Sequence, residues 1–401
     1  MTYDISAFRQ MFPALADGVA RFDGPGGSLV PQPVADAVAA TMAAGLANRG
    51  RLTAAEARTE AVVADARQAI ADLLGADPRG AVFGRSMTGL TFEMARTLAR
   101  SWSPGDEVVV TRLDHDANIR PWVVAAEAVG ATVRWADFDP ATGELAPESV
   151  IDRVGPRTRL VAVTAASNVL GTRPDIPAIA AGARAAGPHD LRVFVDGVHL
   201  TPHAPIDVAA LGADFYACSP YKFLGPHCGA IVADPALLET LRPDKLMPST
   251  DAVPERFELG TLPFELLAGT TAAVDVLAGI APDAAADRRS SVLASMAAVE
   301  QHEAALLRRL LEGLAQIPGV TRHGDPASRT PTVLLTVDGH EPVEVSRHLA
   351  ERGVHAPASH FYALEASRHL GMGDAGGVRV GLAAYTDTAE VDRLLEALAA
   401  L

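Results

Sequence analysis

Lysine and cysteine are scarce in this chain of 401 residues, and basic residues are fewer than acidic ones. Two cysteines exclude a disulfide framework and any zinc module built from several cysteines. Acidic residues number 49 and Lys plus Arg 34, so the formal net charge of −15 offers no general attraction to nucleic acid or anionic membranes. No apolar run reaches the ~18 residues that cross a bilayer, and the N-terminus lacks the pattern of a signal peptide. We therefore expect a cytoplasmic globular protein without nucleic-acid or membrane partners.

Only two of the 34 cationic side chains are lysines, Lys222 and Lys245. Both cationic residue types form ion pairs, but only lysine supplies an amine that can form a Schiff base with a carbonyl group. Lys222 lies in an apolar turn punctuated by glycine and proline, whereas Lys245 lies in a polar segment typical of a surface. Lys222 is therefore the candidate for a chemical role.

Apolar strands alternate with helices over most of the chain, which predicts a parallel or mixed sheet covered on both faces. From about residue 263 the pattern changes to long alanine- and leucine-rich helices with few strands, which predicts a smaller α+β domain. We expect an N-terminal arm at 1–20, a large domain at 21–262 and a small domain at 263–401. The predicted strands are 81–84, 107–111, 131–135, 160–165, 192–195, 214–217, 229–232, 332–336 and 378–381, and the predicted helices are 54–74, 90–100, 268–280, 284–316, 342–352 and 388–400.

Polar residues follow the ends of several predicted strands, where ligands bind in such sheets. They are Thr88, Asn168, Asp196 and Ser219. With His115, His199 and Lys222 they would suit one aldehyde cofactor, pyridoxal 5′-phosphate (PLP). This cofactor needs a lysine, a carboxylate for its pyridine nitrogen, hydroxyl and N–H groups for its phosphate, and a stacking ring. The interval from Asp196 to Lys222 fits one helix-and-strand unit between two strand ends.

The stretch from Val195 to Pro226, which contains Asp196 and Lys222, is similar to a known family pattern. Further similar segments are Asp114-His115-Asp116-Ala117-Asn118, Ser167-Asn168-Val169-Leu170-Gly171 and Arg256-Phe257-Glu258-Leu259-Gly260-Thr261. Together they resemble the class V aminotransferase family of fold-type I PLP enzymes, closest to its cysteine desulfurase-like branch. The likeness extends over nearly the whole chain. It implies a large domain with a mostly parallel, seven-stranded type of sheet.

The resemblance implies a role for the residues around the cofactor ring. Lys222 would bind the cofactor covalently and carry the substrate's α-proton, Asp196 would pair with the pyridine nitrogen, and His115 would stack on the ring. Asn168 and His199 would face the phenolic oxygen of the cofactor.

The resemblance also assigns the phosphate and the substrate carboxylate. Thr88 and Ser219 would hold the phosphate beside Met87 and Tyr221. Thr261 would reach the phosphate bound by a second copy of the chain, which implies a homodimer. Arg379 would grip a substrate carboxylate with two hydrogen bonds. No metal site is expected.

Three departures from the family pattern bear on the reaction. Tyr221 replaces a histidine usual before the lysine, and Met87 replaces a hydroxyl residue. The loop that carries a catalytic cysteine in desulfurases corresponds to residues 356–363, which contain none, and Tyr362 falls near the expected place. Cys218 is expected to be a buried filler, and Cys228, although it follows a histidine, is a poor substitute because adjacent side chains on a strand point to opposite faces.

We therefore expect a PLP-dependent enzyme acting on a small α-amino acid, by transamination or by β-elimination of the C–S lyase type, without forming a protein persulfide. His360 and Tyr362 are candidates for acid or specificity residues above the substrate. Two alternatives stay open: a cysteine desulfurase that uses another nucleophile, and a catalytically silent PLP-binding partner protein.

Overall fold

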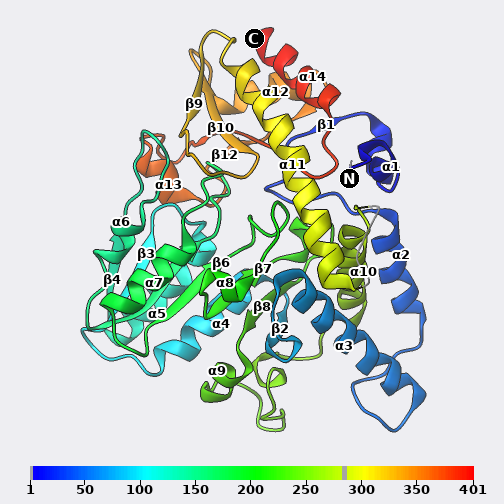
Figure 1. Ribbon diagram of the computed structural model, residues 1–401, viewed down its shortest axis with the longest axis vertical. Helices are drawn as coiled ribbons and strands as arrows, with labels where there is room; N and C mark the ends of the chain where they lie inside the picture. Colours follow the sequence, from blue (N-terminus) through cyan, green and yellow to red (C-terminus); the bar gives the residue numbers. More distant parts are fainter. Residues whose placement is uncertain (1–2, 282–286) are drawn as a thin grey trace.

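Seven strands form the main sheet of the protein (Figure 1). The computed structural model describes residues 3–281 and 287–401. The sheet order is β2 (Ala81–Gly84), β8 (Gly229–Ala233), β7 (Phe215–Cys218), β6 (Arg192–Asp196), β5 (Thr158–Thr164), β3 (Glu107–Thr111) and β4 (Thr132–Ala136). Strands β7, β6, β5, β3 and β4 pair in parallel, and β8 runs antiparallel to both of its neighbours.

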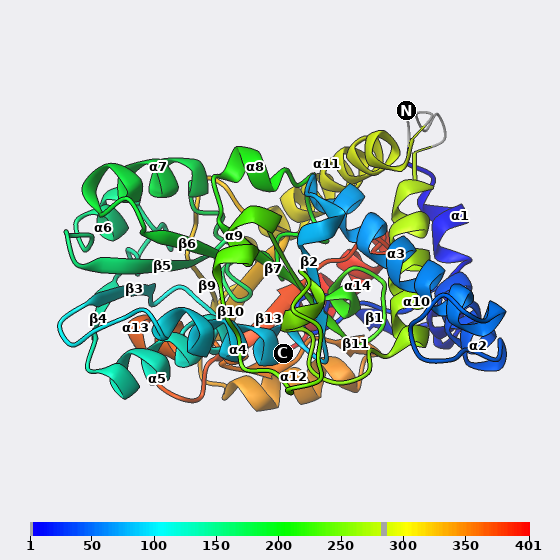
Figure 2. The ribbon, with the colours of Figure 1, turned by 90° about the horizontal axis from the view of Figure 1, so that it is seen from below.

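Helices cover both faces of this sheet (Figure 2). One layer contains α4 (Met87–Ala99) and α5 (Arg120–Val129), and the other contains α6 (Pro147–Ile151), α7 (Ile176–Ala186) and α8 (Val208–Leu211). Alternate side chains of β3 enter different cores, because Val108 and Val110 pack on one face and Val109 on the other. The residues of β3 are therefore buried on both sides, which explains its continuous apolar sequence.

Helix α3 (Ala54–Leu74) contacts β2 and packs against α10 (Phe264–Ala278), which also packs against α2 (Gln32–Ala43). Helix α3 starts at a capping box, in which Thr53 and Glu56 bond each other's backbone N–H groups. It ends at Gly75, whose φ of 68° is the left-handed conformation that favours glycine.

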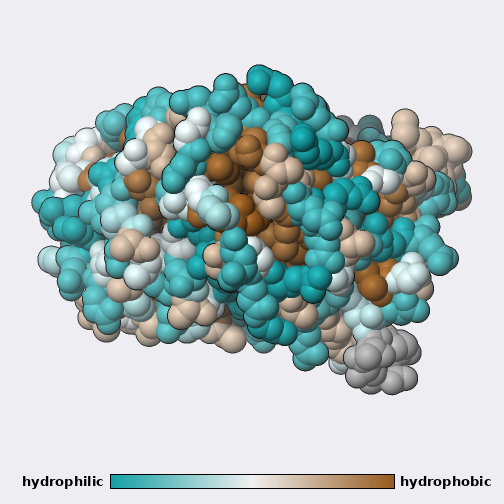
Figure 3. All heavy atoms as spheres, turned by 90° about the horizontal axis from the view of Figure 1, so that it is seen from above, coloured by the Kyte–Doolittle hydropathy of each residue, from teal (hydrophilic) through white to brown (hydrophobic). Residues whose placement is uncertain are grey.

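A second sheet forms the small domain, at the top of Figure 1. Its order is β12 (Ala358–Ser359), β13 (Gly377–Gly381), β10 (Thr332–Val337) and β9 (Val320–His323), all antiparallel. Its core also takes side chains from α11 (Arg288–Leu314), α12 (Pro342–Ala350) and α14 (Thr388–Ala399). Most of the face in Figure 3 is hydrophilic, with apolar residues gathered near its middle.

The N-terminal segment crosses from one domain to the other. Strand β1 (Ala20–Arg21) pairs in parallel with β11 (Val354–His355), and Asp23 forms a bridge with Gly381 of β13. The side chain of Phe22 is fully buried in the core of the small domain. The segment that follows therefore leaves a strand of the small domain and enters the space between the domains.

The predicted α/β architecture is confirmed, and the predicted strands lie within about two residues of the observed ones. The helix predicted at 284–316 corresponds to α11, and its predicted start falls outside the described residues. Helices α2, α5 and α7, strand β9 and several short elements were not predicted. The short elements are α1 (Ile5–Arg9), α6, α8, α9 (Pro235–Thr240), α13 (Leu364–His369), strands β1, β11 and β12, and five 3-10 turns. The domain boundaries stay a prediction.

Candidate active site

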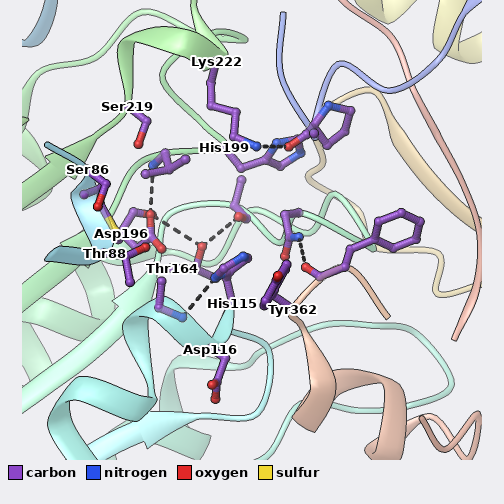
Figure 4. A pocket seen from close by; sticks show the side chains of 18 of the residues that line it. Ser86, Thr88, His115, Asp116, Thr164, Asp196, His199, Ser219, Lys222 and Tyr362 are labelled. Atoms are coloured by element: carbon purple, nitrogen blue, oxygen red, sulfur yellow. Dashed lines mark hydrogen bonds between the residues drawn. The ribbon is translucent and has the colours of Figure 1, made fainter. Parts of the chain in front are cut away.

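A cavity of about 700 Å³ opens at the carboxyl ends of the parallel strands, where the small domain closes over the main sheet (Figure 4). Ten of the eleven residues predicted for the site line it: Met87, Thr88, His115, Asn168, Asp196, His199, Ser219, Tyr221, Lys222 and Arg379. The eleventh, Thr261, is exposed in the segment before α10 and does not line this cavity. His360 does not line it either, whereas Tyr362 does.

Lys222 ends the 3-10 turn Pro220–Lys222 that follows β7. Its Nζ donates a hydrogen bond to the carbonyl oxygen of Pro25 and lies 4.8 Å from the centre of the Tyr221 ring. Burial, together with the positive charge of Arg379, lowers the Lys222 pKa to about 7, although Asp23 and Asp196 act in the opposite direction. A large fraction of this amine is therefore neutral and nucleophilic near neutral pH.

Asp196 is the last residue of β6 and is buried. Its Oδ1 accepts a hydrogen bond of 2.9 Å from the backbone N–H of Val198, and burial raises the Asp196 pKa to about 6. A buried carboxylate that accepts few hydrogen bonds favours a cationic partner. It can therefore hold a protonated ring nitrogen.

His115, which lines the same cavity, is neutral. Burial, then the charges of Lys222 and Arg379, lower the His115 pKa to about 3, and its Nδ1 accepts a bond of 3.0 Å from the Ala117 N–H. The ring of Tyr362 stacks on it with a centre-to-centre distance of 5.5 Å. A neutral aromatic ring in the cavity wall suits stacking against a planar ligand.

A buried network below His115 was not predicted from the sequence. Asp114 is fully buried and accepts hydrogen bonds from Thr111 and from Asn118, whose own Oδ1 accepts a bond of 3.0 Å from the indole of Trp122. Burial raises the Asp114 pKa to about 8. The Asp-His-Asp-Ala-Asn segment could have drawn attention to it, but the pairing with Trp122 needs the turn geometry.

Helix α4 points its N-terminus at the cavity. Ser86 caps it by accepting a bond of 3.1 Å from the Gly89 N–H, and Ser86, Met87 and Thr88 line the wall. The Met87 side chain packs in the core, so the group of Met87 that can bind a ligand is its backbone N–H. Strand β8 passes so close that a Cβ on Gly229 would fall 2.2 Å from the Met87 nitrogen. This 13-residue helix offers N–H groups and a positive dipole end to an anion such as a phosphate.

Arg379 enters the cavity from β13 and is buried to 3% exposure. Its Nη2 contacts Asp23 Oδ1 at 2.5 Å, its Nη1 donates to the Asn168 carbonyl oxygen at 3.2 Å, and its guanidinium lies 3.9 Å from the centre of the Phe361 ring. Within the part of the chain that the structure describes, its Nε has no hydrogen-bond partner. Asp23 and Phe361 were not predicted as site residues.

Asn168 and His199 both line the cavity from neighbouring strand ends. The Asn168 Nδ2 donates a bond of 3.0 Å to the Phe361 carbonyl oxygen, and its buried Oδ1 has no hydrogen-bond partner among residues 3–281 and 287–401. The His199 Nε2 lies 3.1 Å and 3.0 Å from the hydroxyls of Thr330 and Thr332. Burial, then the charge of His203, lowers the His199 pKa well below its usual range, so the ring is neutral.

Both cysteines are buried and neither lines the cavity. Burial raises the pKa of the Cys228 thiol to about 11 and also raises that of Cys218. Each thiol is therefore protonated at neutral pH. Among the described residues, no group of three or more histidine, cysteine or acidic side chains is arranged to hold a metal ion, and no helix is long and apolar enough to cross a membrane.

These residues fit PLP. Lys222 supplies the amine, Asp196 an uncompensated carboxylate, His115 a neutral ring, and the N-terminus of α4 an anion site, all in one cavity. The unpartnered Oδ1 of Asn168 is a further polar atom without a protein ligand.

Comparisons with known proteins agree with this geometry. The model of the family "Aminotransferase class-V" matches residues 21–394. The uncharacterized protein MT3887 of Mycobacterium tuberculosis is 35% identical over 100% of both chains, and a cysteine desulfurase of Salmonella agona is 31% identical over 99% of this chain and 98% of its own. The solved structure of the cysteine desulfurase CsdA of Escherichia coli superposes with a TM-score of 0.85 at 28% identity, covering 99% of this chain and 98% of its own. The chain therefore belongs to the aminotransferase class-V family of PLP-dependent enzymes, and the expected fold-type I architecture is confirmed.

Proposed function

We propose that the protein binds PLP and acts on a small α-amino acid, by transamination or by β-elimination of the C–S lyase type, without forming a persulfide on a protein thiol. One observation carries the proposal: Lys222, Asp196, His115 and Arg379 line a single cavity that no cysteine lines. The proposed reaction therefore uses the side chains of these four residues and needs no thiol.

When bound, PLP withdraws electrons from the substrate's α-carbon. Lys222 would hold the cofactor through its Nζ, and the same amine, once released, would be the base that takes the substrate's α-proton and returns it. Asp196 would keep the ring nitrogen protonated, and His115 would pack against the ring. The backbone N–H groups of Met87 and Thr88 at the start of α4 would bind the phosphate.

Arg379 binds the substrate carboxylate. Its guanidinium carbon lies 3.9 Å from the centre of the Phe361 ring, and among the described residues its Nε has no hydrogen-bond acceptor. A planar guanidinium fixed in this way recognises a carboxylate with two parallel hydrogen bonds. The α-carbon of the substrate is thereby placed between Arg379 and Lys222.

The absence of a cavity thiol separates this chain from a persulfide mechanism, even though one relative is named a cysteine desulfurase. Residues 356–363 hold Tyr362 where a thiol is expected by resemblance, and both cysteines are protonated and buried. A thiol must be ionised and accessible to attack sulfur.

Product analysis tests the proposal. The PLP-loaded protein is incubated with L-cysteine, L-alanine and cysteine conjugates, and products are identified by mass spectrometry. An amino group transferred to a keto acid means transamination, whereas pyruvate, ammonia and a released thiol mean β-elimination. A persulfide on Cys218 or Cys228, or no turnover with any amino acid, would contradict it.

The homodimer also belongs to this proposal. An ion pair between Arg49 and Glu255 joins two neighbouring segments that carry exposed apolar side chains. These side chains are Leu52 on the first segment and Leu246, Met247 and Leu259 on the second, which Thr261 follows. Light scattering should give twice the mass of one chain, and Thr261→Ala should weaken PLP binding without altering that mass. A fully active monomer would contradict it.

A further inference from the structure

The proposed carboxylate site is already occupied by a carboxylate of the chain itself. Asp23 contacts Arg379 Nη2 at 2.5 Å, although the two residues lie 356 positions apart in sequence. Both line the cavity. A substrate carboxylate approaching Arg379 therefore meets a guanidinium that is already paired with a negative charge.

The two members of this pair differ in freedom to move. The Arg379 side chain is 3% exposed and held by the Asn168 carbonyl oxygen and the Phe361 ring, whereas the Asp23 side chain is 31% exposed. Asp23 can therefore turn away into water while Arg379 stays in place.

The backbone that carries Asp23 is fixed on both sides. Before it, Phe22 is fully buried, and its carbonyl oxygen accepts a bond of 2.8 Å from the Gly381 N–H. After it, Ser28 donates through its N–H to the Tyr221 carbonyl oxygen at 2.9 Å, and its Oγ accepts a bond of 2.7 Å from the Leu224 N–H. Displacement of Asp23 thus needs only a side-chain rotation and no movement of the segment.

We propose that Asp23 is an internal competitor for the substrate carboxylate and sets the affinity of the site for amino acids. The pair neutralises a buried guanidinium in the free enzyme, which would otherwise lack a counter-ion. Binding then exchanges one carboxylate for another at Arg379. Only ligands that make two good hydrogen bonds, and gain further binding at their amino group, displace Asp23 efficiently. This inference rests on the proposed role of Arg379 in the preceding section.

The expected size follows from the fraction of free Arg379. If Asp23 occupies Arg379 about nine-tenths of the time, the apparent dissociation constant of a carboxylate ligand is about tenfold weaker than its intrinsic value. Removing the competitor should recover most of that factor. A ligand without a carboxylate should be unaffected.

The structure offers two independent ways to release Arg379. Asp23→Asn removes the charge. Gly26→Ala keeps the charge but adds a Cβ that would lie 2.3 Å from Asp23 Oδ2 and 2.5 Å from its Cγ, so the carboxyl group must move. Gly26 does not have a positive φ, so alanine meets no backbone strain there. Asp116→Asn is the matched control, because Asp116 also lines the cavity but pairs with Arg120 at 3.2 Å.

The experiment compares L-alanine with ethylamine, which is L-alanine without its carboxylate. Dissociation constants for both are measured with PLP-loaded protein by calorimetry, and circular dichroism verifies the fold of each variant. Asp23→Asn and Gly26→Ala should each tighten L-alanine binding by at least about fivefold, with ethylamine and the Asp116→Asn variant within about twofold of wild type.

The inference would be overturned if Asp23→Asn or Gly26→Ala left L-alanine binding unchanged or made it weaker. Asp23 would then position Arg379 or only support the fold. Arg379→Gln tests whether Arg379 binds the carboxylate at all, separately from whether Asp23 competes for it. If it leaves the ratio of L-alanine to ethylamine affinity at the wild-type value, Arg379 is not the carboxylate site, and both the proposed role and this inference fail.

Discussion

Lys222 should react with PLP as a neutral amine well below the pH at which ordinary lysines do so. Burial, with the charge of Arg379 as a second cause, lowers its pKa from 10.5 to about 7. At pH 8 such an amine is about nine-tenths neutral, whereas a lysine of ordinary pKa is about 0.3% neutral, a difference of about 300-fold in reactive amine.

The assay is the rate at which cofactor-free protein gains the visible absorbance of lysine-bound PLP between pH 6 and pH 10. The neutral fraction at pH 6 is about one-tenth, so the rate should rise about tenfold from pH 6 to pH 8 and then level off. Arg379→Gln should move the midpoint to higher pH, because a neighbouring positive charge opposes protonation of the amine.

Two control variants define the source of the signal. Lys245→Arg should leave the profile unchanged, since Lys245 bonds the Ser249 carbonyl oxygen and pairs with Asp251 away from the cavity. Lys222→Ala should abolish the absorbance. A wild-type rate that keeps rising about tenfold per pH unit from pH 8 to pH 10 would refute the lowered pKa.

Three further changes test other parts of the site. Gly229→Ala places a Cβ 2.2 Å from the Met87 nitrogen and so disturbs the start of α4. In fluorescence titrations the affinity of this variant for PLP should fall at least about tenfold, while its affinity for pyridoxal, which lacks the phosphate, should change little. Equal losses of affinity for the two ligands would contradict a phosphate site at the start of α4. Phe361→Leu removes the ring 3.9 Å from the Arg379 guanidinium, so L-alanine should bind about threefold to tenfold more weakly by calorimetry, and unchanged binding would argue against this support. Replacing both cysteines with serine should preserve at least about half of the turnover of any amino acid, because both thiols are buried and protonated; loss of turnover in a folded double variant would point to a thiol mechanism.

Most of the predicted residues that line the cavity could be found because they depend on local sequence. Asp196 ends one apolar strand and Lys222 follows its neighbour in the sheet, and parallel strands bring their carboxyl ends together. The scarcity of lysine in an arginine-rich chain leaves two candidates, and the apolar turn around Lys222 distinguishes it from Lys245.

The Asp23–Arg379 pair could not be predicted in the same way. It joins a segment after β1 to the middle of β13, and no local pattern reports such a contact. Phe361 and Tyr362 adopt φ values of 52° and 57°, unusual for aromatic residues, so the loop that places them is set by its surroundings. There Asn168 donates to the Phe361 carbonyl oxygen and the Asp116 N–H to that of Tyr362.

The missed helices have weak sequence signals. Helix α2 is rich in alanine and buries only Val34, so its apolar stripe is faint. Helix α5 begins at Arg120–Pro121 directly after the segment of His115, and its proline reads equally as a turn. Tertiary packing rather than periodicity decides these elements.

Borohydride reduction of the PLP-loaded protein, followed by peptide mass spectrometry, is the most direct test of whether Lys222 holds the cofactor. The chain has only two lysines, so the assignment is unambiguous. One pyridoxyl group on the peptide containing Lys222, and none on that containing Lys245, is the predicted result. No adduct, or an adduct on Lys245 alone, would contradict the cofactor role and the reaction proposed from it.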